Sequence, residues 1–160
     1  MKLSTKGRYG LRALIDIAVH EDQGPVSVSD IAARQAISEA YLEQLLPRLR
    51  KASLITSQRG AAGGYRLTRP ASEISVGDVL RAMEGSLDAV ACAGLSDEGC
   101  AGADSCVTKY VWKRINESIA AAVDEIWLSS LVEESRKTEA ALAGQEGGEA
   151  VCRCTGQGRS

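Results

Sequence analysis

The chain has 160 residues, of which 44% are hydrophobic and 25% charged, enough for one domain with a core and a helical extension. It contains no Phe and few other aromatic residues, so its core must consist of Leu, Ile, Val and Ala, which is typical of helical proteins. No apolar run approaches the roughly 20 residues that span a bilayer, and the N-terminus lacks the apolar centre of a signal peptide. We therefore expect a cytoplasmic protein with reduced thiols and no membrane partner.

Charge is distributed unevenly along the chain. Residues 1–70 hold eleven Lys and Arg against six Asp and Glu, a net charge of +5. Residues 71–160 hold eight against fifteen, a net charge of −7. This asymmetry favours a polyanion-binding module joined to a part that stays away from the polyanion. Chance is the alternative, because a net charge of +5 is not specific by itself.

The first half of the chain predicts three consecutive helices. Apolar residues at helical spacing indicate a helix over residues 3–20. Ser27 can cap a short second helix, and Ser38 can cap a third helix over residues 39–53. The third helix has a buried stripe of four leucines, Leu42, Leu45, Leu46 and Leu49. A short helix, a tight turn and a helix with exposed polar residues are the pattern of a helix-turn-helix.

Residues 54–68 predict a β-hairpin with a glycine-rich tip. Arg59 precedes the tip and Arg66 lies in the return strand, where an arginine can enter a minor groove or hold a phosphate. An ordinary surface hairpin is the alternative. A capped helix over residues 75–84 follows. We therefore expect a winged helix-turn-helix DNA-binding domain over residues 1–85.

Residues 107–134 predict one long helix with an apolar stripe made of Val111, Ile115, Ile119, Ala122 and Ile126. Such a stripe needs a partner, and a homodimer supplies it; the alternative is packing against the helix over residues 3–20. The expected fold is mainly α with a small β-hairpin wing, a dimerisation helix over residues 107–135 and a disordered tail over residues 136–160.

Three of the five cysteines, Cys92, Cys100 and Cys106, lie in a loop-like segment over residues 86–106 with the spacing C-x7-C-x5-C. A closed zinc site needs four ligands, whereas an iron–sulfur cluster can be held by three cysteines and one other ligand. Two alternatives stay open: zinc bound by the cysteines and a carboxylate, or a thiol switch that forms a disulfide on oxidation. The candidate fourth ligands are solvent, Glu43, Asp97, Glu98, Asp104, Cys152 and Cys154.

Three segments carry a family resemblance: MKLSTKGRYGLRALIDIA, ISEAYLEQLLPRLRKASLITSQRGAAGGYRL and ISVGDVLRAMEG. Together with the cysteines that follow, they resemble the IscR-type winged-helix regulators, bacterial iron–sulfur and redox transcription factors, with NsrR and CymR as more distant relatives. The resemblance covers residues 1 to about 135. It implies a homodimer that binds double-stranded, pseudo-palindromic operator DNA, chiefly as a repressor of iron–sulfur cluster assembly genes.

Two other classes of protein are the alternatives. An enzyme is disfavoured because the sequence has no nucleophile–base pair, no phosphate loop and one histidine. A protein-only adaptor that uses its winged helix for protein contacts is the remaining class.

The resemblance also implies a set of DNA-reading positions: Ser38, Ala40, Tyr41, Glu43, Gln44, Arg59 and Gly60. Gln44 can bond adenine and Glu43 can accept a hydrogen bond from cytosine N4. The alternative for Glu43 is a solvated surface residue. The wing has Ala61 and Ala62 where relatives often have Pro and Gly.

The same resemblance implies an iron–sulfur cluster, 2Fe–2S in preference to 4Fe–4S, delivered by iron–sulfur cluster donors and held by Cys92, Cys100 and Cys106. Relatives complete the site with a histidine three residues after the last cysteine, or with a carboxylate at the position of Arg8. This chain has Lys109 at the first position and an arginine at the second. His20, the only histidine, is expected on the surface. The alternative function is a thiol- or zinc-based redox-sensing winged-helix regulator without a cluster.

Overall fold

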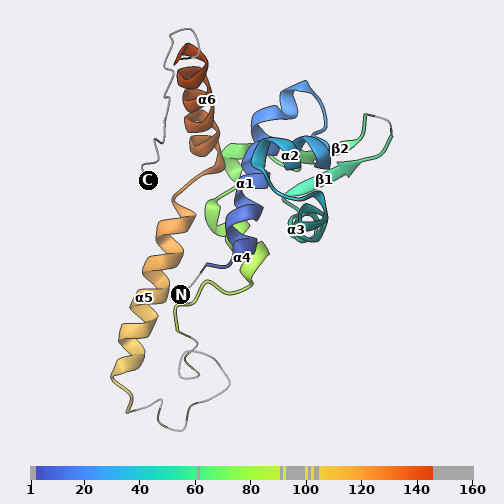
Figure 1. Ribbon diagram of the computed structural model, residues 1–160. Coiled ribbons are helices and arrows are strands. Elements are labelled where there is room, and N and C mark those ends of the chain that lie inside the picture. Colours follow the sequence, from blue (N-terminus) through green and yellow to red (C-terminus); the bar gives the residue numbers. More distant parts are fainter. Residues whose placement is uncertain are drawn as a thin grey trace, which may run out of the picture.

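The computed structural model describes residues 3–60, 62–90, 92, 100, 102 and 105–145. The described chain forms six α-helices and one two-stranded antiparallel sheet (Figure 1). The helices are α1 (Thr5–His20), α2 (Val28–Gln35), α3 (Glu39–Lys51), α4 (Val76–Glu84), α5 (Thr108–Asp124) and α6 (Leu128–Gln145). The strands are β1 (Ile55–Gln58) and β2 (Gly64–Leu67), and short 3-10 helices lie at Glu21–Gln23 and Ala71–Glu73. The predicted mainly α fold with a small hairpin wing is confirmed.

Helix α1 is the centre of the core, and it contacts α2, α3, α4 and α6. Its buried side includes Leu14 and Ile17, which belong to the main hydrophobic cluster. Two buried glycines let α4 approach closely, because a Cβ on Gly10 would lie 2.5 Å from the sulfur of Met83. A side chain at Gly10 would therefore push α4 away from α1.

Helices α2 and α3 form the predicted helix-turn-helix. The amide of Asp30 donates to the hydroxyl of Ser27 at 3.1 Å and caps α2. Ala36 ends α2 in the left-handed conformation, with φ of 52°, and the amide of Tyr41 donates to the hydroxyl of Ser38 at 3.3 Å to cap α3. All four leucines of the predicted stripe on α3 are buried in the core.

The wing is held at its base by a third extended segment. Val26 pairs with Tyr65 through two backbone hydrogen bonds of 2.9 and 2.8 Å. Gly64 precedes this bridge, and a Cβ there would collide with the backbone of Val26. The hairpin therefore starts from a fixed position beside the helix-turn-helix, because its base belongs to the main cluster through Val26 and Ile55.

The prediction of one helix over residues 107–134 is wrong, because the helix breaks at residues 125–127. The backbone after Glu125 pairs with the residues before α4: the Val76 amide donates to the Ile126 carbonyl and the Leu128 amide donates to the Ile74 carbonyl, both at 2.8 Å. Arg81 also binds Asp124 through two hydrogen bonds of 2.7 and 2.8 Å. These long-range contacts end the helix at a point that the apolar periodicity crosses without interruption.

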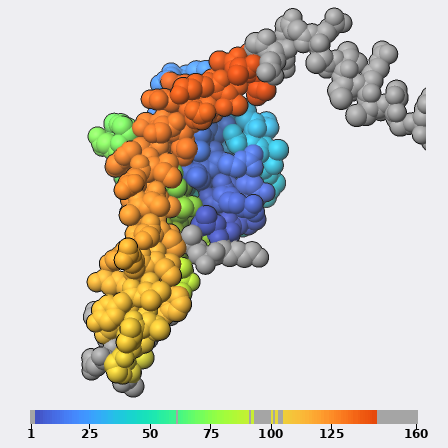
Figure 2. Space-filling model, turned by 90° about the vertical axis from the view of Figure 1, so that its left-hand side faces the viewer, coloured from blue at the N-terminus to red at the C-terminus, as the bar shows by residue number. Residues whose placement is uncertain are grey.

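Helix α6 returns to the body of the molecule and completes its core. Leu128 and Val132 are buried in the main cluster with the residues of α1. The predicted disordered tail is therefore wrong for residues 136–145, which are helical, whereas residues 146–160 lie outside the described part of the chain. Figure 2 shows α5 along one side of the body and projecting beyond it, while α6 bends over the top of the body. None of the described helices combines the length and apolar character needed to cross a membrane.

Replacement of Leu128 with Ala tests the contribution of α6 to the core. We expect the free energy of unfolding to fall by about 2–5 kcal/mol, because the change leaves a cavity beside α1. Leu142→Ala is the control on the same helix, since its side chain is 58% exposed, and it should change stability by less than about 0.5 kcal/mol. Chemical denaturation followed by circular dichroism measures both. If Leu128→Ala lowers the free energy of unfolding as little as Leu142→Ala does, α6 does not contribute to the core.

Candidate nucleic-acid interface and metal centre

The predicted DNA-reading side chains lie on two exposed surfaces. Ser38, Ala40, Glu43 and Gln44 are exposed on the cap and first turns of α3, and Arg59 and Gly60 are exposed at the end of β1. Figure 1 shows the hairpin and α3 on the same side of the body. These positions are therefore accessible to a bound duplex, and their contacts with DNA stay a prediction.

Tyr41 differs from the other predicted positions, because it is half-buried. Its hydroxyl donates to the hydroxyl of Thr5 at 3.2 Å. Its ring packs edge-on against Tyr9, with ring centroids 5.8 Å apart and an interplanar angle of 89°. Tyr41 therefore fastens the start of α3 to the start of α1, a structural contact that the sequence did not indicate.

The wing tip requires a glycine at residue 60. Gly60 has φ of +120°, a conformation that side-chain-bearing residues rarely adopt. Arg59 and Arg66 are both exposed on this hairpin, and Arg50 and Lys51 are exposed at the end of α3. The hairpin and the end of α3 thus present cations that suit a polyanion.

The last turn of α4 connects the cysteine-bearing segment to the helix-turn-helix. The carboxylate of Glu84 accepts hydrogen bonds from the Ser4 hydroxyl at 2.6 Å, the Ser4 amide at 3.1 Å and the Gly7 amide at 3.0 Å. These bonds, chiefly the one from the Ser4 hydroxyl, lower the pKa of Glu84 and place its charge at the positive end of α1. The guanidinium of Arg48 on α3 donates to the carbonyl of Met83 at 3.2 Å. The turn that precedes residues 86–106 therefore contacts both α1 and α3.

The three predicted cysteine ligands are free thiols at the ends and middle of this segment. Cys92 and Cys106 are half-buried and Cys100 is exposed. Among the described residues, no three His, Cys, Asp or Glu side chains come together as a metal site. The described position of Glu43 is the exposed face of α3, while the other candidate ligands lie outside the described residues: Asp97, Glu98, Asp104, Cys152 and Cys154. His20 is occupied elsewhere, since its Nδ1 lies 2.8 Å from the Asp16 carbonyl oxygen.

Cys106 has the chemistry of a metal ligand. It precedes α5, and its sulfur lies 3.2 Å from the hydroxyl of Thr108. This hydrogen bond, followed by one from the Lys109 amide, lowers the pKa of the Cys106 thiol. The thiolate is the form that binds metal, so the donor set of three thiols with a stabilised thiolate among them fits an iron–sulfur cluster.

Asn116, in the middle of α5, was missed by sequence reasoning. Its side-chain oxygen accepts from the Ala89 amide at 2.9 Å, and its side-chain nitrogen donates to the Val90 carbonyl at 3.3 Å. The backbone just before Cys92 is thereby fixed against α5. The only local sign of this role in the sequence is an Asn among good helix formers, because Asn side chains tend to bond backbone groups outside the helix.

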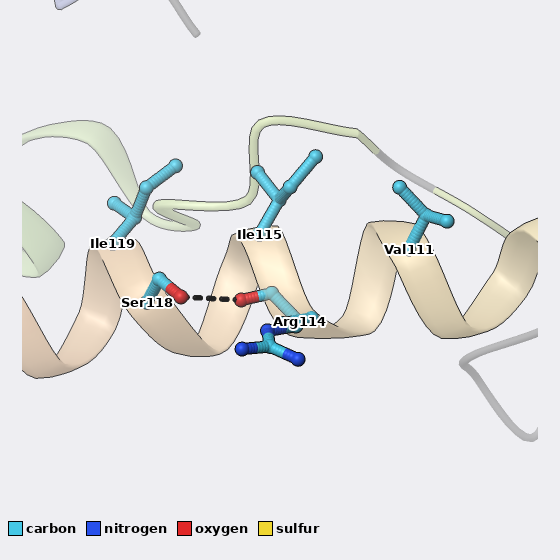
Figure 3. Close-up of a pocket in the computed structure, with 5 residues that line it drawn as sticks. All are labelled: Val111, Arg114, Ile115, Ser118 and Ile119. Atoms are coloured by element: carbon cyan, nitrogen blue, oxygen red, sulfur yellow. Dashed lines mark hydrogen bonds between the residues drawn. The ribbon is translucent and has the colours of Figure 1, made fainter.

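The apolar stripe on α5 faces outward in the single chain. No residue of α5 is buried, and Val111 and Ile115 are 51% and 37% exposed. Figure 3 shows Val111, Ile115 and Ile119 in one row, with Arg114 and Ser118 beside them. These residues line a shallow hollow of about 390 Å³.

A recognition helix with an exposed face, its supporting helix and a hairpin wing define a winged helix-turn-helix transcriptional regulator. Residues 3–134 match the Rrf2 family, described as iron-dependent transcriptional regulators. The chain belongs to this family, so it is a DNA-binding regulator and not an enzyme.

Individual relatives support the IscR-type resemblance. Over 132 residues the chain is 48% identical to the HTH-type transcriptional regulator IscR of Serratia proteamaculans and 47% identical to that of Yersinia enterocolitica, with 82% of this chain and 79% of each relative covered. The structure of T. potens IscR has a TM-score of 0.68 and 43% identity, covering 86% of this chain and 90% of that one. CymR of B. subtilis has a TM-score of 0.69 and 39% identity, covering 84% and 98%.

Proposed function

We propose that this regulator acts as a homodimer that senses an iron–sulfur cluster and controls iron–sulfur cluster assembly genes, chiefly as a repressor. The observation that carries this proposal is the contact of α4 with the recognition helix directly before the three-cysteine segment, through Met83 and Arg48. The iron-dependent description of the family supports it. Zinc and a cluster-free thiol switch are the competing chemistries.

DNA recognition is proposed to use both exposed surfaces. In the major groove, Gln44 and Glu43 supply complementary groups for adenine and cytosine, while Ser38, Ala40 and Tyr41 approach the backbone and base edges. At the wing, Gly60 shapes the tip and Arg59 supplies the charge that enters the adjacent minor groove or binds phosphate.

Replacement of Arg59 with Ala tests the wing. We expect operator affinity to fall by about 1–3 kcal/mol if the guanidinium bonds a base edge, whereas a phosphate contact would show as a salt slope reduced by about 1. Fluorescence anisotropy with an operator duplex over a range of salt concentrations measures both. Lys137→Ala, which removes the same charge from the exposed surface of α6, is the control. Unchanged affinity and slope for Arg59→Ala would exclude this residue from the interface.

The cysteines Cys92, Cys100 and Cys106 are proposed to hold the cluster. When bound, the cluster supplies iron centres that join the thiolates of residues 86–106 through iron–sulfur bonds. Asn116 fixes the start of this segment against α5, and the last turn of α4 bonds the helix-turn-helix. A changed arrangement of the segment is therefore proposed to bias α3, and the difference in operator affinity between the two states is the signal.

A variant with all three cysteines replaced by Ala tests the metal proposal. After anaerobic purification, the wild-type protein should contain iron and sulfide and absorb visible light, and the variant should lose all three while it keeps its circular dichroism spectrum. Removing Cys152 and Cys154 instead should leave the iron content unchanged unless the tail provides the fourth ligand.

Two results would contradict the cluster. Zinc without iron in the wild-type protein would establish the zinc-based alternative. A metal-free protein that forms a disulfide on oxidation would establish the thiol switch, which the lowered pKa of Cys106 favours as the second candidate.

The homodimer is proposed to form through α5, because its exposed apolar row is a surface that a monomer rarely leaves uncovered. Ile115→Glu should convert the dimer to a monomer, since it buries a charge in the interface. Lys113→Glu, which places the same side chain on the opposite side of the helix, should leave the dimer intact. Sedimentation velocity measures both, and a dimeric Ile115→Glu protein would rule out this interface.

A further inference from the structure

A buried carboxylate connects α1 to the end of α2. The side chain of Asp16 is 1% exposed and accepts four hydrogen bonds from two consecutive residues. Arg34 donates to it from Nε at 3.0 and 3.2 Å and from Nη2 at 2.7 Å, and Gln35 donates from Nε2 at 3.0 Å. The three bonds from Arg34 compensate the negative charge of the buried Asp16 carboxylate. Without a well-aligned partner, burial of that charge would be costly.

Gln35 is also held by Arg12, which lies one turn before Asp16 on α1. The Nη2 of Arg12 donates to the Gln35 backbone carbonyl at 2.5 Å, and its Nε donates to the Gln35 side-chain oxygen at 3.2 Å. The side-chain amide of Gln35 therefore uses both of its ends, one toward Arg12 and one toward Asp16. We call the four residues Arg12, Asp16, Arg34 and Gln35 the turn clamp.

The turn clamp acts at the point where the helix-turn-helix changes direction. Gln35 is the last residue of α2, and only Ala36 and Ile37 separate it from Ser38, which caps α3. Ala36 reverses the backbone in the left-handed conformation and Ile37 is buried. Because so few residues intervene, the position of Gln35 limits where α3 can begin.

From this geometry we infer that the turn clamp is a positioning group for the recognition helix, which sets the angle at which α3 presents its side chains to DNA. The apolar core can hold α3 in place, but its contacts are not directional. The clamp adds fork-shaped, charge-assisted hydrogen bonds that do specify direction. An ion pair with a buried carboxylate is weak evidence for stability, and in some proteins such pairs fix one arrangement.

The clamp also limits how far α3 can adjust. Base-edge recognition depends on hydrogen bonds with narrow limits of distance and angle, whereas non-specific binding depends on charge and tolerates a rotated helix. Loosening the clamp should therefore reduce the preference for the operator over other DNA, with little effect on non-specific affinity. This inference rests on the operator binding proposed above.

The experiment uses the full chain and two DNA probes of equal length. One is a duplex that the wild-type protein selects from a randomised library, and the other is its scrambled sequence. The variants are Asp16→Asn, Gln35→Glu and the double exchange, which moves the single carboxylate from residue 16 to residue 35. Arg12→Lys retains the positive charge and changes an exposed residue, so we expect this variant to fold. It provides the test of the clamp if Asp16→Asn does not fold.

We expect Arg12→Lys and each single exchange to bind the selected duplex about tenfold more weakly or worse, with affinity for the scrambled duplex within about twofold of wild type. The double exchange should regain part of the preference, because it restores one carboxylate and one amide to the clamp. Thermal unfolding separates this effect from loss of folded protein.

One outcome would overturn the inference while leaving operator binding intact: a ratio of the two affinities that is the same in the folded variants as in the wild type, whether both affinities are retained or both fall equally. A wild-type protein without any preference would instead refute the proposed operator binding, and the clamp with it.

Discussion

The close packing of helices around α1 is the constraint on which the rest of the structure depends. α1 is in contact with α2, α3, α4 and α6, so the recognition helix, the helix before the cysteines and the C-terminal helix all take their positions from the same support. Gly7 and Gly10 make this possible, because each leaves room that α4 fills with Glu84 or Met83. The polar contacts of α1 with its neighbours then fix directions that apolar packing leaves free. The recognition helix and the helix before the cysteine segment therefore share one support.

Local patterns in the sequence predicted most of this fold. The capping serines at 27, 38 and 75 marked three helix starts, and the leucine stripe of α3 identified its buried side. These features depend on residues within a few positions of one another, so the sequence displays them directly. The break at residues 125–127 could not be predicted in this way. It depends on backbone pairing with residues some fifty positions earlier, and the apolar periodicity continues through it. The helical character of residues 136–145 was missed for a related reason, since the start of α6 is held by burial of Leu128 and Val132 against α1.

The residues of the candidate site also divide into those that the sequence indicated and those that depend on contacts between distant residues. The candidate DNA-reading positions on α3 and the wing came from the family resemblance, and the three thiols were recognised from their loop-like segment. The contacts of Tyr41 with Thr5, of Glu84 with Ser4 and of Asn116 with Ala89 join residues between 27 and 80 positions apart. Such pairs leave no mark in local composition. Through α1, α4 and α5, these contacts connect the recognition helix α3 to the cysteine segment. The sequence therefore indicates the two candidate surfaces but not the contacts that connect them.

The return of α6 to the core changes how the domain is delimited. The winged-helix body is discontinuous in sequence, built from the residues up to the end of α4 together with those of α6. In sequence, the cysteine segment and α5 lie between two pieces of one folding unit. The residues on either side of them, Glu84 and Leu128, both contact the same body. A protein fragment cut after the wing and α4 would therefore lack part of its own interior. In the intact chain, the cysteine segment and α5 therefore join two parts of a single core and do not link separate domains.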